Sequence, residues 1–248
     1  KGFNENAWAN KPLQVGKWTH LAFVKRKDEV KFYIDGALDS ELELRGDTVG
    51  NDGAIYLGAG PNDSDPTAAK FDSFKVHDDA LSASDIAILA LLSDPDDTPD
   101  PDPETKAIVY LNMDEGSGKA AADSSGNGHN GQLVGGATWA SGKNGQGVQT
   151  DGNSGALKIP HNSALNLGND DGDFTTAFWV NLQEGANGNW RGLAKKGDAW
   201  DQRVFVPTAV LLLVFLLCTS HSPFPLLAGS VDGPYEQGLI ILVPVSYT

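Results

Sequence analysis

A stretch of alternating proline and acidic residues divides this chain and constrains its fold more than any other feature. Residues 93–105 read SDPDDTPDPDPET. Proline fixes its own backbone dihedral and biases the preceding residue toward extended geometry, and the like charges repel one another. The stretch is therefore predicted to be a stiff, solvated linker between residues 1–92 and residues 106–203. The remaining residues, 204–248, contain no Lys or Arg and only two acidic residues.

Charge and cysteine content exclude several classes of function. The 248 residues carry 18 Lys and Arg against 33 Asp and Glu, a net charge of −15. Such a surface repels phosphate backbones, so nucleic acid is not an expected partner, whereas hard cations such as calcium are compatible with it. Cys218 is the only cysteine, which excludes an intrachain disulfide and a cysteine-based zinc site. Because the first residue is Lys1 and not Met, we expect a fragment of a longer protein.

The segment 1–92 has the pattern of several short strands followed by one helix. The stretches with strand composition are residues 18–24, 29–36, 54–60 and 71–76. Asp35-Gly36 supplies the positive dihedrals that a tight hairpin needs. Ser82 followed three residues later by Asp85 is a capping box, which predicts a short helix over residues 81–92.

The segment 106–203 is rich in Gly, Asn and Asp and contains further short apolar stretches. Strands are predicted at residues 107–115, 155–160 and 174–182, and a turn-rich loop at residues 123–131. Trp179 beside Phe178 is interpreted as a residue that fills the core.

Two ordered sets of motifs resemble halves of one family. The run GKWTHLAFV, FYIDG, IYLGAG and FDSFKVHDDALSASDI resembles the second half of a laminin-G-like domain. The run YLNMDEGSG, DSSGNGHNGQLVGGATW, GQGVQTDG and LKIPHNSALNLGNDDGDFTTAFWV resembles the first half of the same family. This resemblance implies an all-β fold, the antiparallel jelly-roll β-sandwich of the concanavalin A-like lectins and glucanases.

The order of these halves suggests a window cut from a tandem array. Residues 1–92 are then the C-terminal half of one laminin-G-like domain, and residues 106–203 are the N-terminal half of the next. Half a sandwich exposes its inner apolar face, so the two halves are candidates to pack together as one circularly permuted sandwich. The alternative is that they share no core.

The resemblance also implies a function. We expect a non-catalytic carbohydrate-binding or adhesion module of a secreted or cell-surface protein, with a glycan or a cell-surface protein as its partner. Two alternatives stay open, which are an accessory segment of a secreted glycoside hydrolase and a structural spacer repeat of an adhesin.

A structural calcium ion is the predicted cofactor. Domains that resemble this one often hold an ion near the paired terminal strands, and Ca²⁺ takes six to eight oxygen ligands. The candidate ligands in this sequence are Asp72, Asp114, Glu115, Asp123 and Asn127. The alternative is that Asp123 caps its own turn and Asp114 is a solvated strand end.

Catalysis is not expected from this chain. Glycosidases need two carboxylates that flank the scissile bond, and catalytic relatives of the broad fold carry Glu-x-Asp-x-Glu on one strand. Here only Glu41 and Glu43 alternate and the third carboxylate is absent, which favours a solvated strand face. A catalytic domain outside the given sequence stays open.

Sugar contacts are predicted at tryptophans in or beside loops. An aromatic face can pack against the C–H groups of a sugar ring, and Trp139, Trp190 and Trp200 are the candidates. The alternative is that these side chains pack over the edges of the sandwich.

The apolar tail has three possible origins. Residues 204–218 are continuously apolar but short for a membrane span. The tail is either an aberrant continuation such as a shifted reading frame, a C-terminal anchor over residues 204–229, or a set of buried strands. A membrane is an expected partner only under the second alternative.

Overall fold

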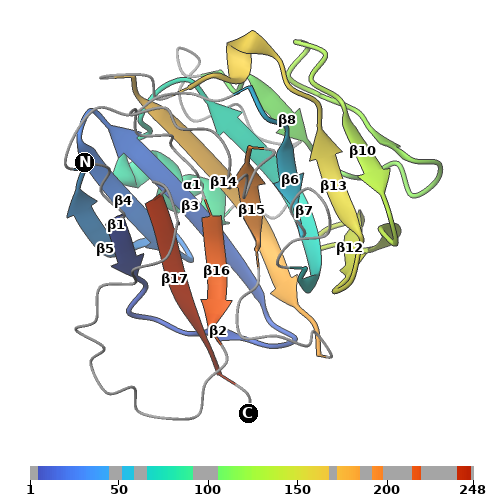
Figure 1. Ribbon diagram of the computed structural model, residues 1–248, viewed down its shortest axis with the longest axis horizontal. Coiled ribbons are helices and arrows are strands. Elements are labelled where there is room, and N and C mark those ends of the chain that lie inside the picture. Colours follow the sequence, from blue (N-terminus) through green and yellow to red (C-terminus); the bar gives the residue numbers. More distant parts are fainter. Residues whose placement is uncertain are drawn as a thin grey trace, which may run out of the picture.

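The computed structural model describes residues 5–44, 52–58, 66–91, 106–167, 172–184, 192–197, 214–218 and 239–246. Over these residues the chain is a β-sandwich with a single α-helix packed outside it (Figure 1). Its two principal sheets are antiparallel, so the predicted all-β sandwich of the jelly-roll type is confirmed.

The larger sheet contains eight strands among the described residues. In spatial order they are β11 (Thr138–Ser141), β12 (Gln146–Asp151), β7 (Ala68–His77), β14 (Phe174–Leu182), β3 (Trp18–Arg26), β4 (Glu29–Ile34) and β5 (Ala37–Glu43), with β8 (Val109–Leu111) also paired to β7. Strand β14 comes from the second sequence segment and lies between β3 and β7, which come from the first.

The second sheet contains five strands among the described residues, and it too combines strands from both sequence segments. Its order is β15 (Ala194–Lys196), β6 (Ile55–Leu57), β13 (Ala156–Ile159), β10 (Gly131–Val134) and β9 (Ala120–Ala121). Here β6 comes from the first segment and lies between two strands of the second. A short 3₁₀ turn, η2 (Ser163–Leu165), follows β13.

One apolar core joins the two sheets. Alternate residues of the larger sheet point into it, including Phe23, Phe71 and Phe178, and Leu57 and Leu157 meet them from the smaller sheet. The ring centroids of Phe71 and Phe178 lie 6.1 Å apart. Residues 1–92 and 106–203 therefore contribute to a common core, as the complementary-halves hypothesis requires; the circular permutation itself stays a prediction.

The helix α1 (Ala83–Leu91) covers part of the outer face of the larger sheet. Its buried residues, Ile86 and Leu89, pack with Tyr33 and Ala177. The predicted capping box is present, since Ser82 Oγ accepts the Asp85 N–H at 3.2 Å and Asp85 Oδ2 accepts the Ser82 N–H at 3.0 Å. In Figure 1 the helix lies on the side of the larger sheet opposite β6, β13 and β15.

The hairpin between β4 and β5 turns as predicted and supports the helix. Asp35 and Gly36 have positive φ values of 51° and 79°. A Cβ added to Gly36 would lie 3.0 Å from Ala90 Cβ and 3.1 Å from Ala87 Cα. Gly36 thus allows both the turn and the close approach of α1.

A separate sheet includes the described parts of the tail. Strand β17 (Leu239–Ser246) pairs in parallel with β1 (Glu5–Trp8), β2 (Leu13–Gln14) and β16 (Val214–Cys218). Of the three origins considered for residues 204–248, strand formation is the one that these pairings support. Most of residues 204–229, the alternative anchor, lie outside the described residues.

Candidate functional site

Asp72 lies on β7 between the residues that pair with β12 and the residues that pair with β8. Strand β7 pairs with β12 through residues 68–71 and with β8 through residues 74–76. Between these stretches Ser73 has a φ of 53°, and the register of β14 shifts between Ala177 and Trp179. This irregularity is a β-bulge, a device that re-aims a side chain. It leaves Asp72 only 2% exposed.

The Asp72 carboxylate holds the turn between β11 and β12. Its Oδ2 accepts the backbone N–H groups of Lys143 at 2.7 Å and Asn144 at 3.1 Å, and its Oδ1 accepts the Ser73 hydroxyl at 3.0 Å. A Cβ at Gly142 would lie 2.6 Å from Oδ2. Only glycine therefore lets the turn approach the carboxylate this closely.

Burial raises the pKa of Asp72 to about 6. The hydrogen bonds from Asn144, Lys143 and Ser73 oppose this shift, and the negative charge of Asp114 adds to it. Asp114 itself is exposed, and its Oδ1 accepts the Gln146 N–H at 2.7 Å. The two carboxylates thus bind the two ends of one turn.

Asp123 organises the predicted loop at residues 123–131. Its Oδ1 accepts the N–H groups of Tyr110 at 2.9 Å and Ser125 at 3.0 Å, and its Oδ2 accepts that of His129 at 2.8 Å. Burial tends to raise the pKa of Asp123, but these hydrogen bonds outweigh it and lower the pKa below its usual value. The carboxylate therefore caps its own turn, as the alternative interpretation stated.

Two further candidates, Glu115 and Asn127, also form hydrogen bonds in or beside this loop. Glu115 Oε1 accepts the Ala122 N–H at 2.7 Å, whereas Glu115 Oε2 is buried and has no hydrogen-bond partner among the described residues. Asn127 is exposed, and its Nδ2 donates to Ile108 O at 3.1 Å.

The five predicted calcium ligands form two groups. Asp72 and Asp114 contact the β11–β12 turn. Asp123 and Asn127 belong to the loop after β9, and Glu115, which precedes β9, bonds the Ala122 N–H at the start of that loop. Within the described part of the chain no three His, Cys, Asp or Glu side chains gather as a metal site. Calcium binding stays a prediction.

The predicted sugar-contacting tryptophans are only partly described. Trp139 on β11 is half-buried against the core, and its Nε1–H donates to Gly118 O at 3.0 Å. Trp190 and Trp200 lie outside the described residues.

Trp179 occupies a position that the sequence interpretation missed. Its neighbours Phe178 and Val180 point into the core, so Trp179 points to the outer face of the larger sheet and is half-buried there. The period-2 alternation of residues 174–182 was the signal that could have placed it. The assignment of Trp179 to the core was wrong, and its neighbour Phe178 fills the core instead.

Trp179 is flanked by a buried histidine and by the ammonium group of a half-buried lysine. The ring centroid of His20 lies 5.3 Å from that of Trp179 in an edge contact, and Lys143 Nζ lies 4.9 Å from the Trp179 centroid. Burial lowers the pKa of His20 to about 4; Asp35 opposes this shift and Lys75 adds to it. His20 is therefore neutral at physiological pH, and its Nδ1 has no hydrogen-bond partner among the described residues.

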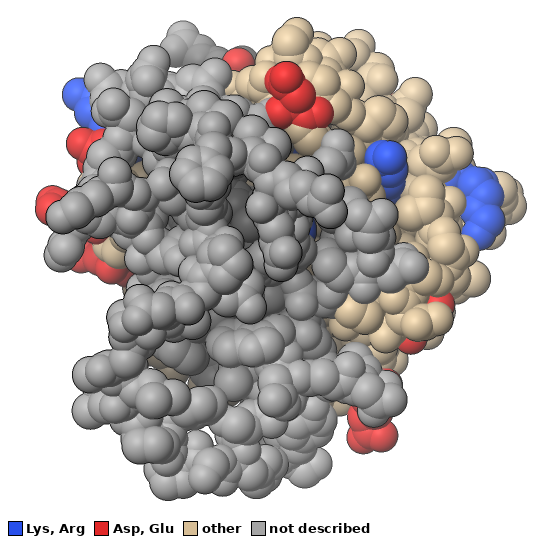
Figure 2. Space-filling view, in the orientation of Figure 1, with Lys and Arg blue, Asp and Glu red and all other residues tan. Residues whose placement is uncertain are grey.

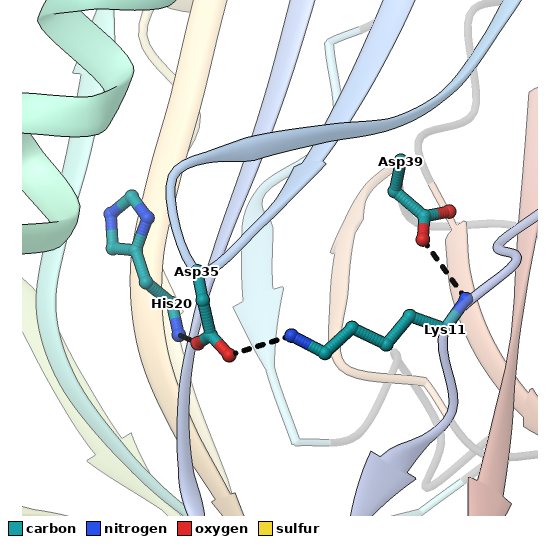
Figure 3. A network of polar contacts seen from close by, with 4 residues as sticks. All are labelled: Lys11, His20, Asp35 and Asp39. Atoms are coloured by element: carbon teal, nitrogen blue, oxygen red, sulfur yellow. Dashed lines mark hydrogen bonds and ion pairs between the residues drawn. The ribbon is translucent and has the colours of Figure 1, made fainter.

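A polar network fixes the strand that carries His20 (Figure 3). Asp35 Oδ1 accepts the His20 N–H at 3.1 Å, and Asp35 Oδ2 lies 3.0 Å from Lys11 Nζ. Asp39 Oδ1 accepts the Lys11 N–H at 2.9 Å. These contacts join the β4–β5 hairpin to the segment between β1 and β2.

Glu41 and Glu43 are both exposed on β5, where they pair across the ladder with Lys31 and Glu29 respectively. They occupy a solvated strand face, as predicted. Asp72 has a raised pKa of about 6, but at 2% exposure it is covered by the turn that it binds.

The geometry defines an all-β sandwich of the jelly-roll type, and one comparison with known proteins agrees with this class over part of the chain. Residues 1–87 match a laminin-G-type family model described as the concanavalin A-like lectin/glucanases superfamily. The match confirms the laminin-G-like resemblance for this segment, which supplies β1 to β7 and the first half of α1. No curated protein and no solved structure matches the chain.

The family match supports a lectin-like or glucanase-like module in general terms. Among the described residues, no helix has the length and apolar character needed to cross a membrane.

Proposed function

We propose that this chain is a non-catalytic carbohydrate-binding or adhesion module of a secreted or cell-surface protein. The concanavalin A-like family match and the shared sandwich core support this class. The observation that carries the proposal is the half-buried indole of Trp179, which lies on the outer face of a rigid sheet and not in the core.

The surroundings of Trp179 suit a sugar ring. An indole offers an apolar face to the C–H groups of a sugar, and polar side chains beside it can bond the hydroxyl groups. Lys143 lies over the ring, and His20 contacts the ring through its edge. Asn181 lies two residues along β14 on the same face of the sheet. Because β14 is hydrogen-bonded on both sides, the platform is preorganised.

The carboxylates support binding in preference to hydrolysis. Asp72, Asp114 and Asp123 each accept backbone N–H groups, and thereby serve the fold. A glycosidase pair instead needs two accessible carboxyl groups facing one bond. Two alternatives differ from this proposal. If the chain were an accessory segment of a secreted glycoside hydrolase, the surrounding reading frame would encode a catalytic domain. If it were an adhesin spacer, it would bind no glycan.

We also propose a calcium ion at the loop after β9. The support is the buried Glu115 Oε2, a carboxylate oxygen without a hydrogen-bond partner in the described structure, close to a loop in which Asp123 Oδ2 accepts a single N–H group. Hard oxygen donors of this kind suit Ca²⁺. The ion would be structural, because it would fix the loop against β8.

Affinity electrophoresis through gels that contain single polysaccharides tests the proposed function. We expect at least one polysaccharide to retard the protein, and Trp179→Ala to weaken that retardation about tenfold or more, the size expected for an aromatic anchor. Trp139→Phe, which keeps an aromatic side chain at the sheet edge, is the matched control. Circular dichroism checks that both variants are folded. Retention of full binding by Trp179→Ala, or no retardation by any polysaccharide, would overturn the proposal.

A further inference from the structure

Two lysine–aromatic pairs lie side by side on the outer face of the larger sheet. Lys143 Nζ lies 4.9 Å from the ring centroid of Trp179, and Lys75 Nζ lies 4.6 Å from that of Tyr110. All four residues are half-buried. We call this set, Lys75, Tyr110, Lys143 and Trp179, the lysine–aromatic cluster.

The strand register places the two pairs next to each other. Lys75 on β7 is the cross-strand partner of Ala177 on one side and of Tyr110 on the other. Trp179, two residues after Ala177 on β14, is opposite His20 and Asp72. Lys75 also lowers the pKa of His20, which contacts Trp179. The ammonium group of Lys143 therefore lies over Trp179 of β14, and that of Lys75 lies over Tyr110 on the far side of β7.

The cluster is positively charged on a strongly acidic protein. The chain carries a net charge of −15, yet both of these lysines lie on one face of the larger sheet. Lys143 forms no ion pair with another described residue. The carboxylate beneath them, Asp72, is 2% exposed and is bonded to backbone N–H groups and the Ser73 hydroxyl. The next acid, Asp114, is bonded to the Gln146 N–H.

The opposite face offers a comparison. In Figure 2, which views the molecule from the side of the smaller sheet, the visible charged side chains of described residues include both signs. Lys158 on β13 has its Nζ 5.5 Å from the ring centroid of Tyr56, so a lysine–aromatic pair also exists there. Lys195 on β15 is the cross-strand partner of Tyr56 on the same face, but it is only 5% exposed. No tryptophan of the described residues belongs to this pair.

We propose that the lysine–aromatic cluster binds an acidic sugar, one that bears a carboxylate or a sulfate group. The sugar ring packs against the indole of Trp179, and its anionic group is bound by the ammonium group of Lys143, with that of Lys75 beside it. A charge-assisted hydrogen bond to an anion is stronger than a cation–π contact. The flexible side chain of Lys143 therefore moves away from the indole ring and binds the anionic group of the sugar. This inference rests on the proposed function and specifies in addition that the sugar ligand is anionic.

Isothermal titration calorimetry with matched oligosaccharides tests it. The acidic probes are oligogalacturonates and heparin-derived oligosaccharides. The neutral probes are the methyl esters of the oligogalacturonates, which have the same ring without the charge, and cello-oligosaccharides. We expect binding to at least one acidic probe, weaker binding or none to the neutral ones, and a decrease in affinity with added salt. Lys143→Gln is expected to weaken acidic binding about tenfold, the loss typical of one charged hydrogen bond.

The control variant is Lys158→Gln, which removes the lysine of the comparable pair on the opposite sheet and should bind like the unmodified protein. Because Lys143 contributes only its backbone N–H to Asp72, Lys143→Gln leaves that hydrogen bond intact. Equal affinity for acidic and neutral probes, or no effect of Lys143→Gln, would overturn this inference while the proposed function stands. Binding to none of the saccharides would overturn both.

Discussion

The carboxylate of Asp72 on β7 accepts the backbone N–H of Lys143 at 2.7 Å. The two residues belong to different sequence segments, separated by the proline–acid linker. The same lysine reaches over Trp179, so one buried carboxylate positions both the β11–β12 turn and a residue of the proposed binding face. The fold and the candidate site are thus coupled through a single side chain.

Asp72 is expected to make the protein more stable as the pH falls from 6 toward 4. Its folded-state pKa is raised from 3.8 to about 6, so the folded state takes up a proton before the unfolded state does. The contribution is fully present below 3.8 and is lost as the pH rises through 6. Asp72→Asn should remove this dependence, which is worth about 3 kcal/mol at most. Urea unfolding of both proteins at several pH values measures it, and parallel profiles would contradict the assignment.

His20 is expected to have the opposite effect on stability, and to make the protein more stable as the pH rises from 4 to 6.5. Burial lowers its pKa from 6.5 to about 4, so its contribution is fully present above 6.5 and is lost as the pH falls. In His20→Phe the ring contact with Trp179 is retained and the titration is removed. The difference in unfolding free energy between variant and unmodified protein should change by about 3 kcal/mol between the two pH limits. A difference that is constant with pH would show that His20 is not buried and neutral.

Gly36 and Gly16 form a matched pair that separates backbone strain from crowding. Both have a φ of 79°, but a Cβ at Gly16 meets nothing within 4 Å, whereas one at Gly36 meets Ala90 and Ala87 of α1. Gly16→Ala should cost about 1 kcal/mol from strain alone. Gly36→Ala should cost a further ~1–3 kcal/mol because α1 must shift. Chemical unfolding gives both values, and equal costs would argue against the described packing of α1.

Calcium is expected to raise the melting temperature if the loop after β9 holds the proposed ion. A ligand at 100 times its Kd stabilises the folded state by about 2.7 kcal/mol. Glu115→Gln should reduce the shift, because it removes the charge of the oxygen that has no partner among the described residues. Magnesium is the control cation. The absence of a shift in the unmodified protein at millimolar calcium would contradict the proposal.

Strongly periodic segments were predictable from the sequence. The stretch 18–24 became β3 (Trp18–Arg26), and residues 174–182 form β14 over the same range. Both stretches are rich in aromatic and β-branched residues, the composition typical of strands, and nearly all of their residues are buried. The helix was also correctly predicted, since a capping box identifies its start independently of packing.

The glycine-rich strands and the position of Asp72 were not predictable in the same way. Strand β12 reads QGVQTD, and its Gly147 carries no side chain that would mark a face. Its place beside β7 is set by long-range pairing of Val148 with Phe71. The burial of Asp72 likewise depends on a turn more than seventy residues away, which no local pattern encodes.

Residues 1–92 and 106–203 build one sandwich, with β14 between β3 and β7. Introducing a specific protease site into the linker at residues 93–105 and cleaving the folded protein tests it directly. Native mass spectrometry and gel filtration should then show the two pieces still associated, at the retention volume of the uncleaved chain, and separating only in denaturant. Dissociation into two independent species under native conditions would contradict the account.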